Sequence, residues 1–466
     1  MGAWPPHPGA PLLERWRLRF ARPYPGLPDQ AFEEPIFQGR PRPGARLTQV
    51  NAVGARRTAT IESPATFFLV NDPAGVKRVL VDNVANYPKT DFERCGLTIL
   101  FGAGLLGSGG EIWRRHRRIM ASVFHPTSLG AHLSAMAATS ESFRERLDAR
   151  VGEEIDATRE MSILTLRIIS EAMFSSDSEE AVHLIGAAFA DGGRAEKMSL
   201  PTRGRARQKA RMERSFPSID ALVYRLVKKR MENEHHRSDL LGRMISARDE
   251  AGVQMTEREI CDEVLTVFVA GHETTAAAMG WIWYLLSERP CEEARLHEEL
   301  ARVLDGRTPR RDDMQDLVFT RQLIEEVLRF YPPVTGLATR ACLADDTICG
   351  RIIPAGASIA ISPFVMHHHR CLWDDPERFD PDRFSPARRA RHHRFSYLPF
   401  GAGPHICIGQ VLAINELVVI LSTLAQTHRL RVAPRARVGF AQHLTFRPAN
   451  LRMIVERRNN GASPHR

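Results

Sequence analysis

Features that place a protein in a membrane or outside the cell are missing from this sequence. No run of eighteen apolar residues occurs in the 466-residue chain, so no segment is long enough to form a membrane-spanning helix. The first twenty residues are rich in proline and arginine and lack the apolar core of a secretory signal. We therefore expect a cytoplasmic protein with no membrane span.

Paired cysteines are also absent. The chain has seven cysteines, an odd number, and no two have C-x-x-C spacing. A chain of this length needs no disulfide to hold its core, so we expect reduced thiols. At least one cysteine is free for chemistry, although burial as a structural thiol is the usual fate of a lone cysteine.

No internal repeat and no long flexible linker divide the chain. The most linker-like stretch, residues 192–215, is short and basic. Hydrophobic residues make up 43% of the sequence, enough for a sizeable core. We expect one domain over residues 1–466, with an irregular N-terminal segment over residues 1–50 and a disordered tail over residues 457–466.

Positive charge is in moderate excess. Lys and Arg number 64 and Asp and Glu number 55, which gives a formal charge of +9. Such a balance suits an acidic protein partner, a nucleic acid or an anionic membrane surface. The sign of the charge alone does not choose among these partners.

Hydrophobic periodicity predicts a mainly α-helical protein with a smaller β part, an α+β fold. Residues 66–70 read as a strand, and Asp72-Pro73 supplies an N-cap and a first-turn proline for a helix. The expected longer helices cover residues 111–125, 128–151, 156–175, 179–191, 216–234, 256–288, 291–304, 319–330 and 407–428.

The pattern changes after Pro332-Pro333. Residues 347–356 predict a hairpin because Gly and Pro punctuate a short apolar alternation. Residues 363–399 form a coil rich in Pro, Arg and His, and strands are expected between residues 430 and 456.

A glycine motif near the N-terminal third does not indicate a dinucleotide site. Residues 102–107 fit G-x-G-x-x-G and follow a strand-like run at 97–101. Such a site also needs a helix that opens at the third glycine and an acidic residue about twenty positions later. Here residues 108–110 prolong the loop, and residues 123–133 contain no Asp or Glu. We interpret the motif as a glycine-rich loop that leads into a helix near Glu111.

Two histidine patterns do not indicate metal sites. His272-Glu273 begins like a zinc protease motif, but residue 276 is alanine, so the second histidine of that motif is missing. The tracts 367–369 and 235–236 could bind a metal adventitiously, and we interpret both as solvated loops.

The segment Phe400–Gly409, FGAGPHICIG, is the most informative part of the sequence. Glycines and a proline ahead of Cys407 make a rigid loop whose amides can turn toward the sulfur. A helix begins directly afterwards, and its positive end lowers a thiol pKa. Gly409 lets a flat ligand approach the backbone closely. Taken alone, Cys407 is better interpreted as a buried structural thiol between a loop and a helix.

The pattern F-G-x-G-x-H-x-C-x-G resembles the haem-binding loop of the cytochromes P-450. The resemblance implies that Cys407 is the metal ligand of haem b (iron protoporphyrin IX). It also implies that Phe400, Gly401, His405 and Gly409 bind the cofactor. The family more often has arginine at the position of His405, and a histidine there can still donate to a haem propionate.

A second segment resembles the family's E-x-x-R helix. Glu326 and Arg329 share a helix face at this spacing, and two prolines follow them. Downstream, the run around Arg378 resembles the segment that supplies a second arginine. The resemblance implies a structural triad of Glu326, Arg329 and Arg378 that pins the coil beneath the haem.

Further positions imply contacts to the haem propionates. Trp113 and Arg117 match the family's W-x-x-x-R helix, and their i, i+4 spacing puts them on one face. Arg340 stands where the family commonly has another propionate-binding basic residue. The alternative for each arginine is an ordinary place on the surface.

The helix expected over residues 256–288 opens with a capping box and is long enough to cross a whole domain. Its residues 270–275, AGHETT, resemble the family's oxygen-activating sequence. By resemblance, Ala270 leaves room for dioxygen, and Glu273 and Thr274 are the catalytic residues that deliver protons. The alternative is a buried helix whose small residues serve close packing.

The resemblance implies a monooxygenase that inserts one oxygen atom from O2 into an apolar substrate, either terpenoid, steroid or fatty-acid-like. The expected pocket residues are Leu105, Phe268, Val269, Val334, Leu337 and Leu444. The sequence does not identify the substrate.

We expect electrons to come from a separate ferredoxin or flavodoxin with its NAD(P)H-dependent reductase, because the haem domain consumes the whole chain. Arg114, Arg115 and Arg118 lie on the helix of Trp113 and could steer an acidic carrier. We expect a monomer and no nucleic-acid partner.

Three alternatives remain at this point. A peroxide-driven peroxygenase on the same fold tends to lack the acid–alcohol pair that Glu273 and Thr274 supply. A non-catalytic haem carrier or sensor has no need of that pair. A nucleotide-binding dehydrogenase would differ at once in its cofactor absorption spectrum.

Overall fold

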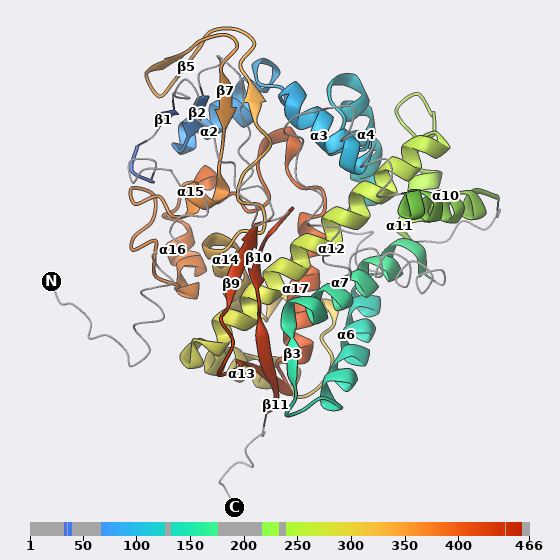
Figure 1. Ribbon diagram of the computed structural model, residues 1–466, viewed down its shortest axis with the longest axis vertical. Helices are drawn as coiled ribbons and strands as arrows, with labels where there is room; N and C mark the ends of the chain where they lie inside the picture. Colours follow the sequence, from blue (N-terminus) through green and yellow to red (C-terminus); the bar gives the residue numbers. More distant parts are fainter. Residues whose placement is uncertain are drawn as a thin grey trace, which may run out of the picture.

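The structure is a computed structural model that describes residues 32–34, 36–39, 67–125, 132–175, 217–232, 239–442 and 444–458. It is mainly helical with small sheets, as the sequence predicts. One long helix, α12, runs diagonally through the centre of the molecule, and the other elements are arranged around it (Figure 1).

Apart from α3 and α11, which were not predicted, the longer helices lie close to the predicted ranges. The longer ones are α3 (Asp91–Phe101), α4 (Gly110–Val123), α6 (His132–Asp148), α7 (Ala157–Phe174), α10 (Pro217–Glu232), α11 (Leu240–Ser246), α12 (Glu257–Ser287), α13 (Pro290–Leu304), α14 (Val318–Phe330) and α17 (Gln410–Leu424). Short ones are α2 (Pro73–Lys77), α15 (Pro363–His367) and α16 (Pro386–Arg389). The helix expected over 179–191 lies outside the described residues. No helix among the described residues is long and apolar enough to cross a membrane.

The strands form four small sheets. One sheet has the order β1-β2-β7-β4 and another the order β3-β11-β8, while β5 pairs with β6 and β9 with β10 as hairpins. The bounds are β1 (Ile36–Gly39), β2 (Phe67–Val70), β3 (Glu154–Asp156), β4 (Arg340–Ala341), β5 (Asp346–Ile348), β6 (Arg351–Ile353), β7 (Ser358–Ala360), β8 (His428–Val432), β9 (Gly439–Gln442), β10 (Phe446–Ala449) and β11 (Arg452–Arg457).

Three local expectations were wrong. The strand-like run at 97–101 is the end of α3, which starts at an N-cap where the Thr90 hydroxyl accepts from the Glu93 amide. In the N-terminal segment expected to be irregular, β1 pairs antiparallel with β2. At the other end, Arg457 is the last residue of β11, and residues 459–466 lie outside the described part.

The capping box at the start of α12 is formed as predicted. The Thr256 hydroxyl accepts from the Glu259 amide, and the Glu259 carboxylate accepts from the Thr256 amide. This reciprocal pairing satisfies amide groups that the first turn of a helix leaves free. The helix then continues for 31 residues, which corresponds to about 46 Å at the rise of an α-helix.

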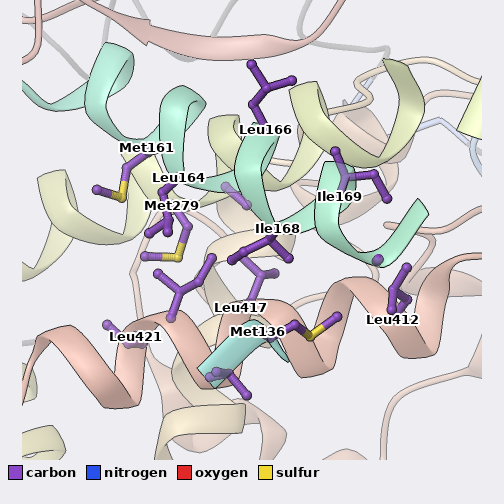
Figure 2. Close-up of a cluster of buried hydrophobic side chains, with 14 of the residues drawn as sticks. Met136, Met161, Leu164, Leu166, Ile168, Ile169, Met279, Leu412, Leu417 and Leu421 are labelled. Atoms are coloured by element: carbon purple, nitrogen blue, oxygen red, sulfur yellow. The ribbon is translucent and has the colours of Figure 1, made fainter. Parts of the chain in front are cut away.

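The main core lies where α17, α7 and α12 pack together. Figure 2 shows Leu417 and Leu421 of α17 next to Met279 of α12 and Leu164 of α7, and all four are buried. Burial of such side chains gives about 1.5–3 kcal/mol each. The core therefore fixes α17, which follows Cys407 directly in the chain, against the long helix.

The histidine tract 367–369 is not a solvated loop, which corrects the sequence interpretation. All three histidines are buried. The Nδ1 of His367 lies 3.1 Å from the Arg329 carbonyl, and its Nε2 accepts from the Leu398 amide at 2.8 Å. Burial holds the pKa of His367 well below its usual range. The tract therefore joins α14 to the chain ahead of Cys407, and no cluster of three potential metal ligands occurs among the described residues.

The second arginine of the predicted triad is Arg383 and not Arg378. Glu326 and Arg329 form a fully buried bidentate pair with distances of 2.7 and 2.8 Å. The Nε of Arg383, also buried, lies 3.5 Å from Glu326. Arg378 is exposed and contributes only its carbonyl oxygen, which accepts from both buried arginines at 3.1 Å. Sequence spacing in a coil cannot tell which of two nearby arginines turns inward.

The buried triad ties down the coil 363–399. The guanidinium of Arg329 donates to the carbonyls of His367 and Pro376, and that of Arg383 donates to those of Asp374 and Asp375. Each charge is thus both paired and hydrogen-bonded, the condition under which a buried ion pair is tolerated.

We predict that Glu326→Ala and Arg383→Ala each lower the free energy of unfolding by about 3–5 kcal/mol, because the remaining buried charge loses its partner. The matched control Arg378→Ala should change it by no more than about 0.5 kcal/mol. Urea unfolding of the purified holoenzyme, followed by circular dichroism, measures both. If Arg378→Ala lowered the free energy of unfolding as much as Arg383→Ala, the assignment of Arg383 as the second arginine of the triad would be wrong.

Candidate active site around the Cys407 loop

The loop before Cys407 is shaped by two glycines with left-handed backbone. Gly401 and Gly403 have φ angles of +70° and +71°, which residues with a side chain rarely adopt. A Cβ on Gly403 would come within 1.9 Å of the Leu80 carbonyl oxygen. The Cys407 amide donates to the Phe400 carbonyl at 2.9 Å. The loop is therefore closed and pressed against the segment after α2.

The Cys407 thiol is accessible and yet strongly desolvated. Its side chain retains solvent access, while burial raises its pKa. The Gly409 amide and the positive charge of Arg117 act in the opposite direction and favour the thiolate. A sulfur with both properties lies in a recess of the protein. Gly409 is the N-cap residue of α17, which begins three residues later than the expected start at 407, and a Cβ on Gly409 would touch only the Cys407 sulfur, at 3.9 Å.

A cluster of basic groups lies beside this recess. Arg340 is 5% exposed, and its Nε and Nη1 have no partner among the described residues. Burial lowers its pKa to about 10. Burial and the charges of Arg340, Lys89 and Arg117 lower the pKa of His405 to about 3. The predicted residues Arg117, Arg340 and His405 therefore do come together in one basic cluster.

Trp113 joins the same cluster. Its ring centroid lies 3.8 Å from that of His405, with the planes tilted by 34°. The contact fixes α4 against the Cys407 loop. It brings the predicted W-x-x-x-R helix and the predicted F-G-x-G-x-H-x-C-x-G loop to one place.

Lys89 is a member of the cluster that the sequence analysis missed. Its ammonium donates to the carbonyls of Leu105 and Leu106 at 3.3 and 2.6 Å, and its backbone forms a bridge with Arg340. Burial, and then the charge of Arg340, lower its pKa to about 8. A single lysine in an irregular segment has no spacing pattern, so no sequence signal could have singled it out.

The long helix α12 has one accessible window. Every residue from Ile260 to Leu286 is buried except Ala270, Gly271 and Thr274. Positions 270 and 274 share a face, so a space open to small molecules adjoins this turn. The Thr274 hydroxyl donates to the Ala270 carbonyl at 2.7 Å. The window coincides with the predicted AGHETT segment.

Glu273 is turned away from Thr274. The carboxylate is buried and accepts from the Thr445 hydroxyl at 3.3 Å, next to the hairpin of β9 and β10. The structure thus places the predicted acid–alcohol pair on one turn of α12, with each side chain engaged by a different partner.

The expected pocket residues differ in how far they are buried. Val334 and Leu337 are half-buried, and Leu337 lies 3.7 Å from the position of a Cβ on Gly401. Leu105 and Val269 are buried and Leu444 is 37% exposed. Phe268 is a correction, because it is 1% exposed and stacks on Phe174 of α7 in the core. Residues two apart on a helix point to opposite sides, so Phe268 faces away from the window at Ala270.

The glycine-rich loop 102–107 packs against α12. A Cβ on Gly102 would come 2.3 Å from the Asp262 carboxylate, and one on Gly104 would come 2.5 Å from the Thr266 hydroxyl. The Ala103 amide donates to Asp262 at 2.9 Å. Close approach to a helix explains the glycines without a nucleotide.

The arginines expected to steer a carrier are paired with acids. Arg115 is half-buried and binds Asp249 and Glu259 at 2.8 and 2.9 Å. It is therefore not available on the surface to steer a carrier, which corrects the expectation for this residue. Arg114 and Arg118 are exposed and form ion pairs with neighbouring glutamates.

Comparison with known proteins agrees with this geometry. Residues 62–453 match the family model described as Cytochrome P450. The chain is 32% identical over 413 residues to the cyclooctat-9-en-7-ol 5-monooxygenase of Streptomyces melanosporofaciens, which covers 85% of this chain and 87% of that one. It is 34% identical over 367 residues to the pentalenene oxygenase of Streptomyces avermitilis, which covers 77% and 81%. The crystal structure of the cytochrome P450DA heme domain has a TM-score of 0.77, 24% identity and 98% and 97% coverage, and shows the same fold.

The chain therefore belongs to the cytochrome P-450 family and is a haem-thiolate monooxygenase. The residues around Cys407 fit such a group. Arg340 offers unpartnered guanidinium nitrogens for a carboxylate, and Cys407 offers an accessible sulfur whose charge the Gly409 amide stabilises.

We predict that Lys89→Met and Arg340→Leu increase the rate of haem loss on the order of tenfold, because each removes a positive charge from the basic cluster that would face the haem propionates. The control Lys77→Met removes a surface ammonium that pairs only with Asp82, and it should leave the rate unchanged. Transfer of haem to excess apomyoglobin measures the rate. Unchanged haem loss in both Lys89→Met and Arg340→Leu would show that the basic cluster does not hold the propionates.

Proposed function

We propose that the enzyme binds haem b through Cys407 and oxygenates an apolar, terpenoid-like substrate with electrons from a separate carrier. The observation that carries the proposal is the window at Ala270, Gly271 and Thr274, the one accessible turn from Ile260 to Leu286 of α12. This turn offers a small apolar surface that can contact a substrate and the hydroxyl of Thr274, which can take part in proton transfer.

In this proposal, Cys407 ligates the iron and the amide of Gly409 spreads the thiolate charge. Arg117, Arg340, His405 and Trp113 hold the propionates, while Phe400, Gly401 and Ala270 border the macrocycle. When bound, the haem supplies the activation of dioxygen and the transfer of one oxygen atom.

The chain itself handles the protons. The Thr274 hydroxyl donates its one proton to the Ala270 carbonyl. Its oxygen can therefore accept a hydrogen bond from a proton donor in the window. Glu273, one residue away, is the acid that supplies protons once it leaves the Thr445 hydroxyl. This acid–alcohol pair also disfavours the peroxygenase and carrier alternatives.

We predict that Thr274→Ala leaves substrate binding nearly unchanged and diverts most consumed electrons into hydrogen peroxide, because the hydroxyl that would relay protons at the window is removed. Thr274→Ser, which keeps the hydroxyl, should retain coupling. The ratio of product to NAD(P)H consumed in the reconstituted system measures the effect. Normal coupling in Thr274→Ala would exclude the role of Thr274.

The apolar substrate class rests on the pocket residues and on the relatives. Leu105, Val269, Val334 and Leu337 carry no group that could pair with a charge, and an unpaired buried ion costs several kcal/mol. Two relatives are named for oxygenation of cyclooctat-9-en-7-ol and pentalenene. A fatty acid would need a partner for its carboxylate, and Arg94, a basic residue of α3 that could meet it at the pocket mouth, is half exposed and pairs with Asp91. A terpenoid or steroid skeleton is therefore favoured over a fatty acid.

We predict that cyclic terpenes convert the ferric protein from low to high spin and bind more tightly than fatty acids or small polar metabolites. Each additional buried methylene should strengthen binding by up to about 0.8 kcal/mol. Optical titration of the purified holoenzyme measures the affinities. Tighter binding by polar metabolites than by any apolar candidate would overturn the substrate class.

We propose a ferredoxin or flavodoxin with its NAD(P)H-dependent reductase as the electron source, acting on a monomeric single-domain enzyme in the cytoplasm. The exposed Arg114 and Arg118 of α4 are the candidate docking residues, since α4 packs on the Cys407 loop through Trp113.

We predict that the rate of reduction falls steeply with salt and falls further in Arg118→Glu, because surface charges steer the encounter. Arg302→Glu, on α13 at the opposite end of the molecule (Figure 1), is the matched control. Stopped-flow reduction by a panel of acidic carriers measures the rates. Reduction that does not depend on salt would contradict electrostatic docking.

A further inference from the structure

A buried acid on α17 has no place in the mechanism described so far. Glu416 is 3% exposed and lies one helical turn from Leu412, on the face that packs against other helices. Leu412 and Leu417 belong to the apolar cluster drawn in Figure 2. A carboxyl group in such surroundings requires a specific partner or the loss of its charge.

The only hydrogen bond of Glu416 among the described residues is with Thr275 of α12. The Thr275 hydroxyl lies 3.3 Å from Oε2 of Glu416 and 3.1 Å from the carbonyl oxygen of Gly271. The other carboxyl oxygen, Oε1, has no partner in the described part of the chain. Glu416 therefore bridges α17, which begins after Cys407, to the turn of α12 that forms the window.

The proton count of this bridge determines the protonation state of Glu416. A threonine hydroxyl has one proton, and the helix geometry directs it to the Gly271 carbonyl, as in other helical threonines. With that proton on the carbonyl, the 3.3 Å contact to Oε2 is a hydrogen bond only when the carboxyl group carries a proton of its own, and a carboxyl group buried without a charged partner favours the protonated form. Burial raises the pKa of Glu416 to about 8, in agreement with this count.

Three successive carbonyls of α12 share this kind of contact. The Ala270 carbonyl accepts from Thr274 at 2.7 Å, the Gly271 carbonyl from Thr275 at 3.1 Å and the His272 carbonyl from Thr165 of α7 at 3.2 Å. Hydroxyls that bond back to the preceding turn compete with the helix amides. The backbone geometry of the turn that carries Thr274 therefore depends on which carbonyl each hydroxyl donates to.

We propose that Glu416 is a positioning residue that holds a proton at neutral pH and donates it to Thr275. Thr275 in turn keeps its own proton on the Gly271 carbonyl and so fixes the turn that carries Thr274. The catalytic part of this inference rests on the proposed role of Thr274, while the protonation state of Glu416 does not.

The surroundings of Glu416 isolate its titration. Helices α6, α12 and α14 pack against α17, and among their described residues none contributes a charge that shifts the pKa of Glu416. Burial raises this pKa, and the one opposing contact among the described residues would be a Thr275 hydroxyl that donated to the carboxylate instead of to the Gly271 carbonyl.

The first experiment tests the proton. Infrared spectra of the holoenzyme at pH 7 should contain a protonated-carboxyl band that disappears in Glu416→Gln and weakens as the pH passes about 8. The pKa of Glu416 in the folded protein lies above its ordinary value of 4.5. The stability of the wild type relative to Glu416→Gln is therefore greatest below pH 4.5. The melting temperature of the wild type should therefore fall relative to that of Glu416→Gln between pH 4.5 and about pH 8, and the difference should be constant above about pH 8. A carboxyl band absent at pH 7, or a difference that does not vary with pH, would overturn the protonated state.

The second experiment tests positioning. We expect Glu416→Leu and Thr275→Val to raise the share of electrons recovered as hydrogen peroxide several-fold, with substrate affinity changed little. Glu416→Gln and Thr275→Ser keep a donor and a hydroxyl and should restore coupling. Ser422→Ala is the control, since this buried hydroxyl of α17 bonds only within its own helix.

The outcomes separate this inference from the proposed function. Thr275→Val, which removes no buried charge, remains informative if Glu416→Leu does not fold. Full coupling in Thr275→Val while Thr274→Ala uncouples would overturn the positioning role alone. Full coupling in Thr274→Ala would remove the proposed function, while the infrared band would still decide the protonation of Glu416.

Discussion

If Cys407 ligates the haem as a thiolate, as we propose, the protein must hold a negatively charged sulfur in its interior, and much of this structure bears on that need. Burial opposes the thiolate of Cys407, and the amide of Gly409 and the charge of Arg117 favour it. Gly401 and Gly403 make the turns that bring the loop to this position. The fully buried Glu326–Arg329–Arg383 triad then holds the coil that leads to the loop. The chemistry of one sulfur thus depends on an ion cluster that does not touch it.

The second constraint is that a long buried helix must open at one turn. Small residues at 270 and 271 give access at the window, and threonine hydroxyls take over the carbonyl contacts there. The bridge from Glu416 to Thr275 links this turn to α17 and so to the loop of Cys407. The accessible turn of α12 and the helix that follows Cys407 are therefore connected by a buried carboxyl group as well as by apolar packing.

The sequence predicted the parts of the fold that local patterns encode. The capping box before α12 and the apolar periodicity of α7 and α14 gave bounds close to those observed. Features set by tertiary packing could not be predicted: which of Arg378 and Arg383 turns inward, and that a histidine tract is buried. Lys89 and Glu416 escaped notice because a lone charged residue carries no pattern until the fold surrounds it.

The central claim, thiolate ligation by Cys407, is tested most directly by the absorption spectrum of the ferrous carbon monoxide complex. The wild type should have the strongly red-shifted Soret band of a haem with a thiolate ligand. Cys407→Ala should lose that band, while Cys371→Ala, which alters another exposed thiol, should keep it. A red-shifted band that persists in Cys407→Ala would contradict the account.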